Sequence, residues 1–363
     1  MLRQTGNDEP RKSTTLAPPL PLPTEILSLV FAYLLDTDRK SLARCCRVSH
    51  SIFSIAAPIL YRRIRISNVL RRDSRVDHSP DRYTATGKEK TNTRKKKLLK
   101  NAEVVTFDDH HATWCGNKTF KYPKLKILVL NLALVGLGSV LHSNDILEKQ
   151  CSLVKCLEPN KLVLNNMSLI NIQTFDMFGV PHKLFGIIEE ITLIAPLLPG
   201  KPRTIYGGFA TMPQLKKLVW IFRTVSPGPR WVPGIHDMLG ERQMSKLDSD
   251  LQALANFMNG IPVDVPTFIV NIGSMHHRYV GEDTWNERRI QDSFANKLKQ
   301  AMIAEKLDDW RHRDEANQLG IEERRDIAIG KADSIQMLTM KEYLENHDWT
   351  GEFDYREAKL WLA

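Results

Sequence analysis

The sequence predicts a protein of class α+β, in which a small three-helix domain precedes a larger α/β, repeat-like domain. Three observations predict it. Apolar residues recur at helical spacing between residues 20 and 66, a six-residue apolar pattern recurs from residue 101 onward, and a polar basic stretch separates the two. At 363 residues the chain is too long for one ordinary core and suits a small domain joined to a larger one.

The first domain is expected at residues 20–66, after a polar, proline-bearing tail at residues 1–19 that we expect to be disordered. Its first helix carries two apolar stripes with a spacing of four: Ile26, Val30 and Leu34, and Leu27, Phe31 and Leu35. Asp36-Thr37-Asp38 ends this helix and offers caps for a second helix. A third helix is expected to stop at Pro58. Three helices this short form a marginal core that a partner would stabilise.

Residues 67–100 are expected to be a basic, disordered linker. Between Tyr61 and Lys100 there are 14 Lys and Arg against 4 Asp and Glu, which accounts for the whole net charge of +9. The stretch lacks the interleaved aromatic residues that stack on bases, which argues against nucleic acid as a partner. A solvated loop is the favoured interpretation, and a nuclear-import signal at Arg94, Lys95, Lys96 and Lys97 is the alternative.

The second domain is expected at residues 101–345, followed by a C-terminal helical tail at residues 346–363. The pattern apolar, two variable, apolar, variable, apolar predicts strands around residues 102–107, 125–130, 188–193, 215–220, 265–270 and 335–340, with a further strand at 161–165. Irregular intervals between them indicate parallel strands separated by loops or helices of varying length. Capping boxes are expected at Thr284–Glu287, Thr339–Glu342 and Asp354–Glu357, and residues 305–333 fit either an exposed helix or a loop.

Five cysteines, an odd number, do not suggest a disulfide framework. The N-terminal residues lack the apolar segment of a secretory signal, and no apolar run reaches the length of a membrane span, so no membrane partner is expected. A reducing compartment follows, either the cytoplasm or the nucleus.

Titratable residues gather in one segment, FDDHHATWCGN, which holds Asp108, Asp109, His110, His111 and Cys115. His111 and Cys115 have a spacing that suits a metal, but no CxxC or second His/Cys pair completes a four-ligand site by sequence. We therefore expect a polar loop after a strand, and no metal. Motifs of phosphate-binding loops, nucleophile elbows and zinc proteases are also missing, so neither a cofactor nor catalytic residues are expected, and the chain is not expected to be an enzyme.

The segment LPLPTEILSLVFAYLLDTDRKSLARCCRVSHSIFSIAAPILYRRIRI resembles the F-box in its fungal form. The similarity rests on Leu22-Pro23 before Glu25-Ile26, on Ser41-Leu42, on the run Cys46-Arg47-Val48-Ser49, on Phe53, and on the exit Ala57-Pro58 with Leu60-Tyr61-Arg62. Phe53 stands where the family often has tryptophan. The region that follows resembles an irregular leucine-rich-repeat-like domain, although Asn131, Asn165 and Asn166 come earlier than the asparagine of that repeat.

The resemblance implies a substrate receptor of an SCF-type ubiquitin ligase, with a Skp-type adaptor, a cullin–RING scaffold and an unknown protein substrate as partners. The adaptor contacts it implies are Leu22, Pro23, Ile26, Leu27, Val30, Leu42, Val48 and Phe53. A substrate would bind the concave strand surface, where Lys126, Lys217 and Trp220 are the candidates. Two alternatives remain open: a Skp-bound scaffold or regulator that delivers nothing for ubiquitination, and a basic nuclear protein that binds nucleic acid.

Overall fold

The computed structural model describes residues 22–67, 97–110, 112–115, 121–135, 138–142, 151–166, 180–196, 212–223, 251–252, 254–274, 280, 282–311, 320–353 and 355–362. The chain divides into two compact units, Met1–Leu60 and Tyr61–Ala363. Among the described residues, no helix is both long and apolar enough to cross a bilayer.

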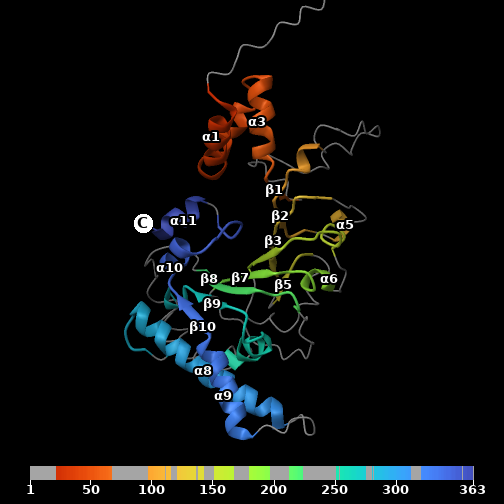
Figure 1. The fold of residues 1–363 in the computed structure, drawn as a ribbon. Helices are drawn as coiled ribbons and strands as arrows, with labels where there is room; N and C mark the ends of the chain where they lie inside the picture. The colour runs from red at the N-terminus through yellow and green to blue at the C-terminus, as the bar shows by residue number, and fades with distance from the viewer. Residues whose placement is uncertain are drawn as a thin grey trace, which may run out of the picture. The chain divides into compact units, whose positions relative to one another are not determined.

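Three helices form the first unit: α1 (Thr24–Thr37), α2 (Arg39–Cys45) and α3 (His50–Leu60) (Figure 1). Their shared core consists of the buried residues Leu27, Phe31, Leu42, Ala56 and Ile59. Asp38 caps α2 by accepting a hydrogen bond from the Ser41 amide at 3.2 Å, as the sequence predicts. The expected stop at Pro58 is wrong. Helix α3 runs through this proline to Leu60, which keeps Ile59 in the core.

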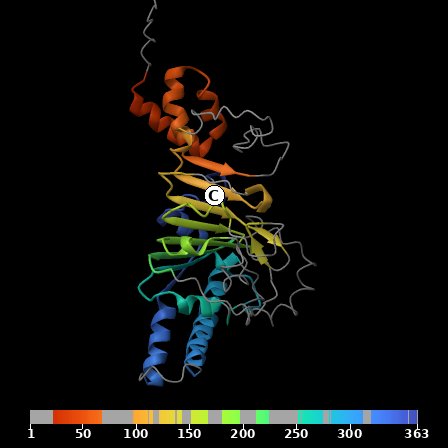
Figure 2. The same ribbon diagram turned by 90° about the vertical axis from the view of Figure 1, so that its right-hand side faces the viewer.

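The second unit is built on a sheet of eight parallel strands (Figure 2). They are β1 (Arg63–Ile66), β2 (Val104–Asp108), β3 (Ile127–Asn131), β6 (Lys161–Asn165), β7 (Glu190–Pro196), β8 (Lys217–Arg223), β9 (Thr267–Val270) and β10 (Ile335–Leu338). Their order in space follows their order in the chain. Seven of the eight are the predicted strands. Strand β1 is not among the predicted strands, because residues 63–66 directly follow an apolar helix and were expected to belong to the helical domain.

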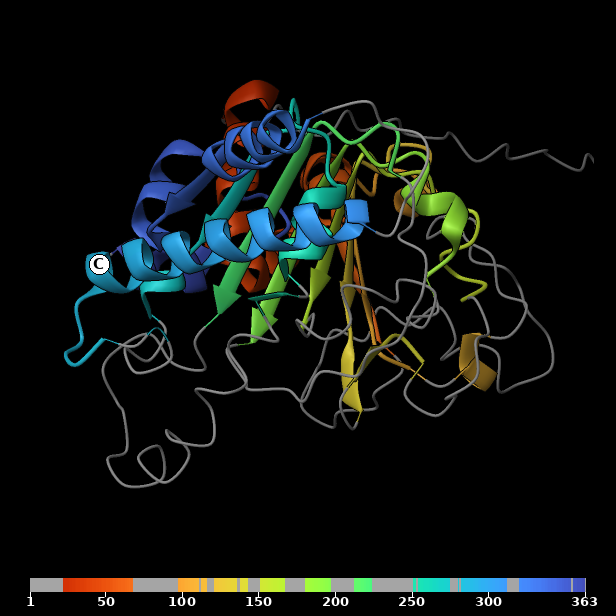
Figure 3. The ribbon, with the colours of Figure 1, turned by 90° about the horizontal axis from the view of Figure 1, so that it is seen from below.

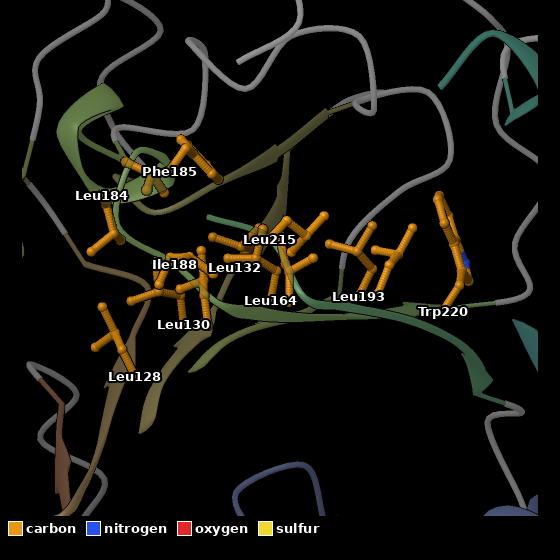
Figure 4. Packing of buried hydrophobic residues seen from close by; sticks show 14 of the residues in the cluster. Leu128, Leu130, Leu132, Leu164, Leu184, Phe185, Ile188, Leu193, Leu215 and Trp220 are labelled. Carbon is orange, nitrogen blue, oxygen red and sulfur yellow. The ribbon is translucent and has the colours of Figure 1, made fainter. Parts of the chain in front are cut away.

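Alternating side chains give the sheet two faces. One face packs the main core, with Leu130, Leu164, Leu193 and Trp220 in a row across the strands (Figure 4). The other face buries a smaller cluster that includes Val129, Val163, Val219 and Phe268. The six-residue pattern predicts the main-core face correctly from β2 to β8. In β9 it is wrong by one residue, because Ile269 aligns with Trp220 while Phe268 points to the smaller cluster.

Helices cover both faces of the sheet. Helices α6 (His182–Phe185) and α8 (Glu287–Arg311), together with the helical residues 254–260, contribute to the main core, and α9 (Ile321–Asp333) packs along α8 (Figure 3). Helices α10 (Met340–Asn346) and α11 (Tyr355–Leu362) cover the smaller cluster. Short elements complete the unit: α5 (Ala112–Cys115), the antiparallel pair β4 (Ala133–Val135) and β5 (Gly138–Val140), and the 3₁₀ turn η4 (Ile272–Ser274).

A buried ion pair fixes the C-terminal segment to the sheet. Lys161 Nζ in β6 lies 2.8 Å from Glu352 Oε1, and the two side chains are 9% and 0% exposed. Thr192 donates a hydrogen bond to Glu352 Oε1, and the Tyr343 hydroxyl donates one to Oε2, both at 2.7 Å. Burial and the Glu352 charge raise the pKa of Tyr343. Residues 346–353 are therefore part of the folded sheet unit.

Of the expected capping boxes, one is present and a second is replaced by a different cap. The Thr339–Glu342 box is present at the start of α10. At α8 the amide of Arg289 donates instead to Asn286 Oδ1, so the helix starts with Asn286 as its cap and not Thr284. Residues 305–311 and 321–333 are helical, and Asp354 lies outside the described residues. The leucine-rich-repeat classification of this sheet stays a prediction.

Candidate functional site

The first unit exposes a stripe of large apolar side chains along α1. Its members are between 44% and 67% exposed: Leu22, Ile26, Leu29, Val30 and Tyr33. At 3.6 residues per turn, Ile26, Leu29, Val30 and Tyr33 lie on one side of the helix, while Leu27 and Phe31 face the core. Val48, after α2, is 74% exposed. We call Leu22, Ile26, Leu29, Val30, Tyr33 and Val48 the apolar patch. Large exposed apolar groups gathered on one small unit are typical of interaction sites.

The structure divides the eight predicted adaptor residues between surface and core. Leu22, Pro23, Ile26, Val30 and Val48 are exposed. Phe53 is half-buried.

Leu27 and Leu42 are buried, at 8% and 0% exposed, so they pack the helices together and present little surface to a partner. Sequence reasoning missed Leu29 and Tyr33. Their spacing of three and seven residues from Ile26 was the signal that could have found them.

Cationic side chains lie close to Val48 in sequence, on α2 and in the turn after it. Lys40, Arg44 and Arg47 are all exposed. Apolar centres with a charged rim are the usual anatomy of a protein–protein interface, and the sign of this rim favours an acidic partner surface.

On the sheet unit, a row of polar side chains crosses the ends of four neighbouring strands. Arg65 Nε lies 3.0 and 2.8 Å from the two carboxylate oxygens of Asp108. Asn131 Nδ2 donates to Asp108 Oδ1 at 2.6 Å, and Asn165 Nδ2 donates to Asn131 Oδ1 at 2.7 Å. Asp108, Asn131 and Asn165 are direct partners in the strand register, so their side chains share one face. We call Arg65, Asp108, Asn131 and Asn165 the polar row.

The three strand residues proposed for substrate binding lie in different environments. Lys126 is exposed and pairs with Glu103 at 3.1 Å. Lys217 is half-buried, and its Nζ lies 5.7 Å from the centre of the Phe268 ring. Trp220 is fully buried, so its candidacy is wrong; it occupies the last apolar position of the six-residue pattern, which faces the main core.

Four metal-ligand side chains meet beside the end of β2. His110, Cys115, His142 and Cys151 are all buried, and their potential ligand atoms lie within 4.8 Å of one another. Burial, followed by the neighbouring Cys115, raises the pKa of Cys151. The sequence analysis paired Cys115 with His111, whereas the structure places Cys115 with His110, and His142 and Cys151 join them from distant sequence positions as a second His/Cys pair. His111 lies outside the described residues.

The candidate nuclear-import signal remains a prediction. Of its four residues the structure describes Lys97, the exposed first residue of a short helical turn, whereas Arg94, Lys95 and Lys96 lie outside the described residues.

Comparison with known families identifies the first of these regions. Residues 20–67 match the family model of the F-box-like domain. The match includes the three helices, the apolar patch and strand β1. Neither a curated protein nor a solved structure matched the chain. Proteins with this domain are typically non-enzymatic adaptors, and the domain generally binds a Skp-type adaptor of SCF-type complexes.

Proposed function

We propose, from the F-box-like domain at residues 20–67, that this chain is the substrate-recognition adaptor of an SCF-type ubiquitin ligase. The observation that carries the proposal is the apolar patch, which α1 leaves exposed although the same helix also supplies the core of its unit. A Skp-type adaptor would cover the patch and connect the chain to a cullin–RING scaffold. The chain itself would contribute proximity and orientation of the substrate, and the conjugating enzyme would supply the chemistry.

Within the three-helix unit we assign two kinds of role. Ile26, Val30 and Tyr33 would insert into the adaptor surface, since exposed large apolar and aromatic side chains supply most of the binding free energy at interfaces. Leu27 and Leu42 would hold the helices in the geometry that presents them. Substituting a core residue would therefore weaken adaptor binding only by unfolding the unit.

The sheet unit would hold the substrate. The successive parallel strands and their shared six-residue pattern support a leucine-rich-repeat-like domain, and such domains bind ligands across their strands. The polar row supports a binding surface at the ends of β1, β2, β3 and β6. Arg65 is the residue we select there, because its side chain is 63% exposed and its guanidinium is oriented by Asp108.

Protein turnover tests this function against the scaffold alternative. The full-length native chain and a double variant, Ile26→Asp with Val30→Asp, are expressed separately in cells. Proteins crosslinked to each form are identified, and the half-life and ubiquitination of each captured protein are then measured. A substrate receptor predicts that the same proteins are captured by both forms but become longer-lived and less ubiquitinated with the variant. Val263→Asp, an exposed apolar residue of the sheet unit at 55%, is the matched control and should leave the half-lives as in the native chain.

Captured proteins whose half-life and ubiquitination do not depend on the apolar patch would overturn the receptor role. A chain that still bound a Skp-type adaptor under those conditions would be a scaffold or regulator.

A further inference from the structure

The cluster of His110, Cys115, His142 and Cys151 has the composition of a structural metal site. His110 follows β2, Cys115 ends α5, His142 follows β5, and Cys151 begins the next described segment. All four side chains are at most 4% exposed. Imidazoles are polar groups that are seldom gathered in pairs inside an apolar core, and a shared cation is one arrangement that uses both imidazoles and both thiols as ligands.

Two sulfur–nitrogen distances within the cluster are close to those of a tetrahedral zinc site, and all four ligand atoms lie within 4.8 Å of one another. Cys151 Sγ lies 3.4 Å from His110 Nε2, and Cys115 Sγ lies 3.4 Å from His142 Nε2. In a tetrahedron with Zn–S bonds of about 2.3 Å and Zn–N bonds of about 2.0–2.1 Å, sulfur and nitrogen are about 3.6 Å apart. The two sulfur–nitrogen pairs therefore already have nearly the separation that a zinc ion would impose.

Hydrogen bonds outside the cluster orient the ligands. His110 Nδ1 lies 2.8 Å from the backbone oxygen of Asp108, so Nδ1 carries the proton and Nε2 presents its lone pair to the cluster. The His110 amide donates to Leu141 O at 2.9 Å, which places His142 beside His110. The two imidazole rings are 5.0 Å apart between centroids and are inclined by 74°, a separation that is compatible with two ligands of one ion.

We propose that His110, Cys115, His142 and Cys151 together bind one structural Zn²⁺. Two sulfur and two nitrogen ligands in a tetrahedron select zinc over the oxygen-preferring cations. Four protein ligands leave no position for a substrate or water, so the ion would stabilise the fold and would not catalyse a reaction. Both thiols are deprotonated when they bind, and two protons leave to solvent.

The ion would tie together chain segments that are far apart in sequence. His110 and Cys151 are separated by 41 positions, and the hydrogen-bonded carbonyl next to His110 belongs to Asp108 of the polar row. Zinc would thus anchor the end of β2, two residues beyond Asp108 of the polar row. The metal site itself does not depend on the proposed function.

Metal analysis of the full-length chain tests the site. The chain purified without chelator should contain one zinc per molecule by mass spectrometry of the metal. Cobalt exchanged into the site should give the absorption bands of a tetrahedral ion with thiolate ligands. Cys115→Ser and Cys151→Ser should each lose most of the zinc, whereas Cys156→Ser, the exposed cysteine, should retain it.

Two results would overturn the proposal. One is a folded native chain without zinc that neither takes up added zinc nor gives the cobalt bands. The other is a disulfide between Cys115 and Cys151, detected by mass under non-reducing conditions. The native chain decides the question even when the serine variants fail to fold. The Ile26→Asp, Val30→Asp double variant should keep its zinc, which separates the metal site from adaptor binding.

Discussion

Replacing Glu352 with glutamine should destabilise the sheet unit more than any exchange of an exposed charge. The substitution keeps the shape of the side chain but leaves the Lys161 ammonium, which is 9% exposed, without its carboxylate partner. Removing one member of a buried ion pair typically costs about 3–5 kcal/mol. Lys161 Nζ retains the backbone oxygens of Asp348 and Thr350 at 3.4 and 3.5 Å, so we expect the lower end, about 3 kcal/mol.

Thermal unfolding followed by circular dichroism measures this loss. The unfolding entropy is about 2.1 cal/mol/K per residue, so 1 kcal/mol corresponds to about 1.6 °C in Tm for the unit Tyr61–Ala363, and Glu352→Gln should lower Tm by about 5 °C. The matched control is Glu189→Gln, which removes an exposed pair with Lys216 at 2.9 Å and should cost at most about 1 kcal/mol. Adding Lys161→Met to Glu352→Gln should recover part of the loss, because the unpaired buried charge is then gone.

Equal Tm values for Glu352→Gln and Glu189→Gln would refute this reasoning. The apolar contacts of the C-terminal segment, which include Tyr343, Leu344 and Phe353, would then be sufficient to hold it to the sheet.

Three further substitutions test separate features. Burial, assisted by the charge of Lys306, lowers the pKa of Lys331 to about 8, so the folded chain binds fewer protons than the unfolded chain between pH 8 and 10.5 and stability rises with pH there. Lys331→Met should therefore raise the free energy of unfolding at pH 7, and this gain should shrink above pH 8. Gly351→Ala should cost about 1–2 kcal/mol, because φ is +85° and the new Cβ would lie 2.8 Å from Ile127 Cγ2. Thr339→Ala should cost about 1 kcal/mol by removing the cap of α10.

Chemical denaturation measures all three differences. A Lys331→Met gain that is constant from pH 6 to pH 11 would show that the ammonium is not the destabilising group. Unchanged stability of Gly351→Ala would show that residue 351 does not need the left-handed conformation, and unchanged stability of Thr339→Ala would show that another group replaces the cap.

Local patterns predicted most of the strands and the helical unit. The apolar spacing placed α1, and the six-residue pattern placed seven strands of the sheet, because both signals lie within a few residues of chain. The pattern failed at β9, where Phe268 and Ile269 are both apolar and only the register with β8 decides which one faces the main core. Strand β1 was not predicted, because it directly follows an apolar helix and its apolar residues were assigned to the helical domain.

The candidate sites were predictable to different degrees. The exposed apolar residues of α1 could be expected, because the helix carries two apolar stripes and a small core buries mainly one of them. The sequence does not say which stripe is buried. The metal cluster was beyond local reasoning. His110 and Cys115 are close in sequence, whereas His142 and Cys151 are distant in sequence, and His142 is brought beside His110 by a backbone bridge between the two residues.

Calorimetric titration of the full-length chain with a Skp-type adaptor tests the central claim most directly. The native chain should bind with a micromolar or lower Kd. The double variant Ile26→Asp with Val30→Asp should bind at least about 100-fold more weakly, since a hot-spot residue contributes about 2 kcal/mol or more and every 1.4 kcal/mol is a factor of ten. Val263→Asp should bind as the native chain does. A folded native chain that fails to bind, or a double variant that binds equally well, would contradict the adaptor function.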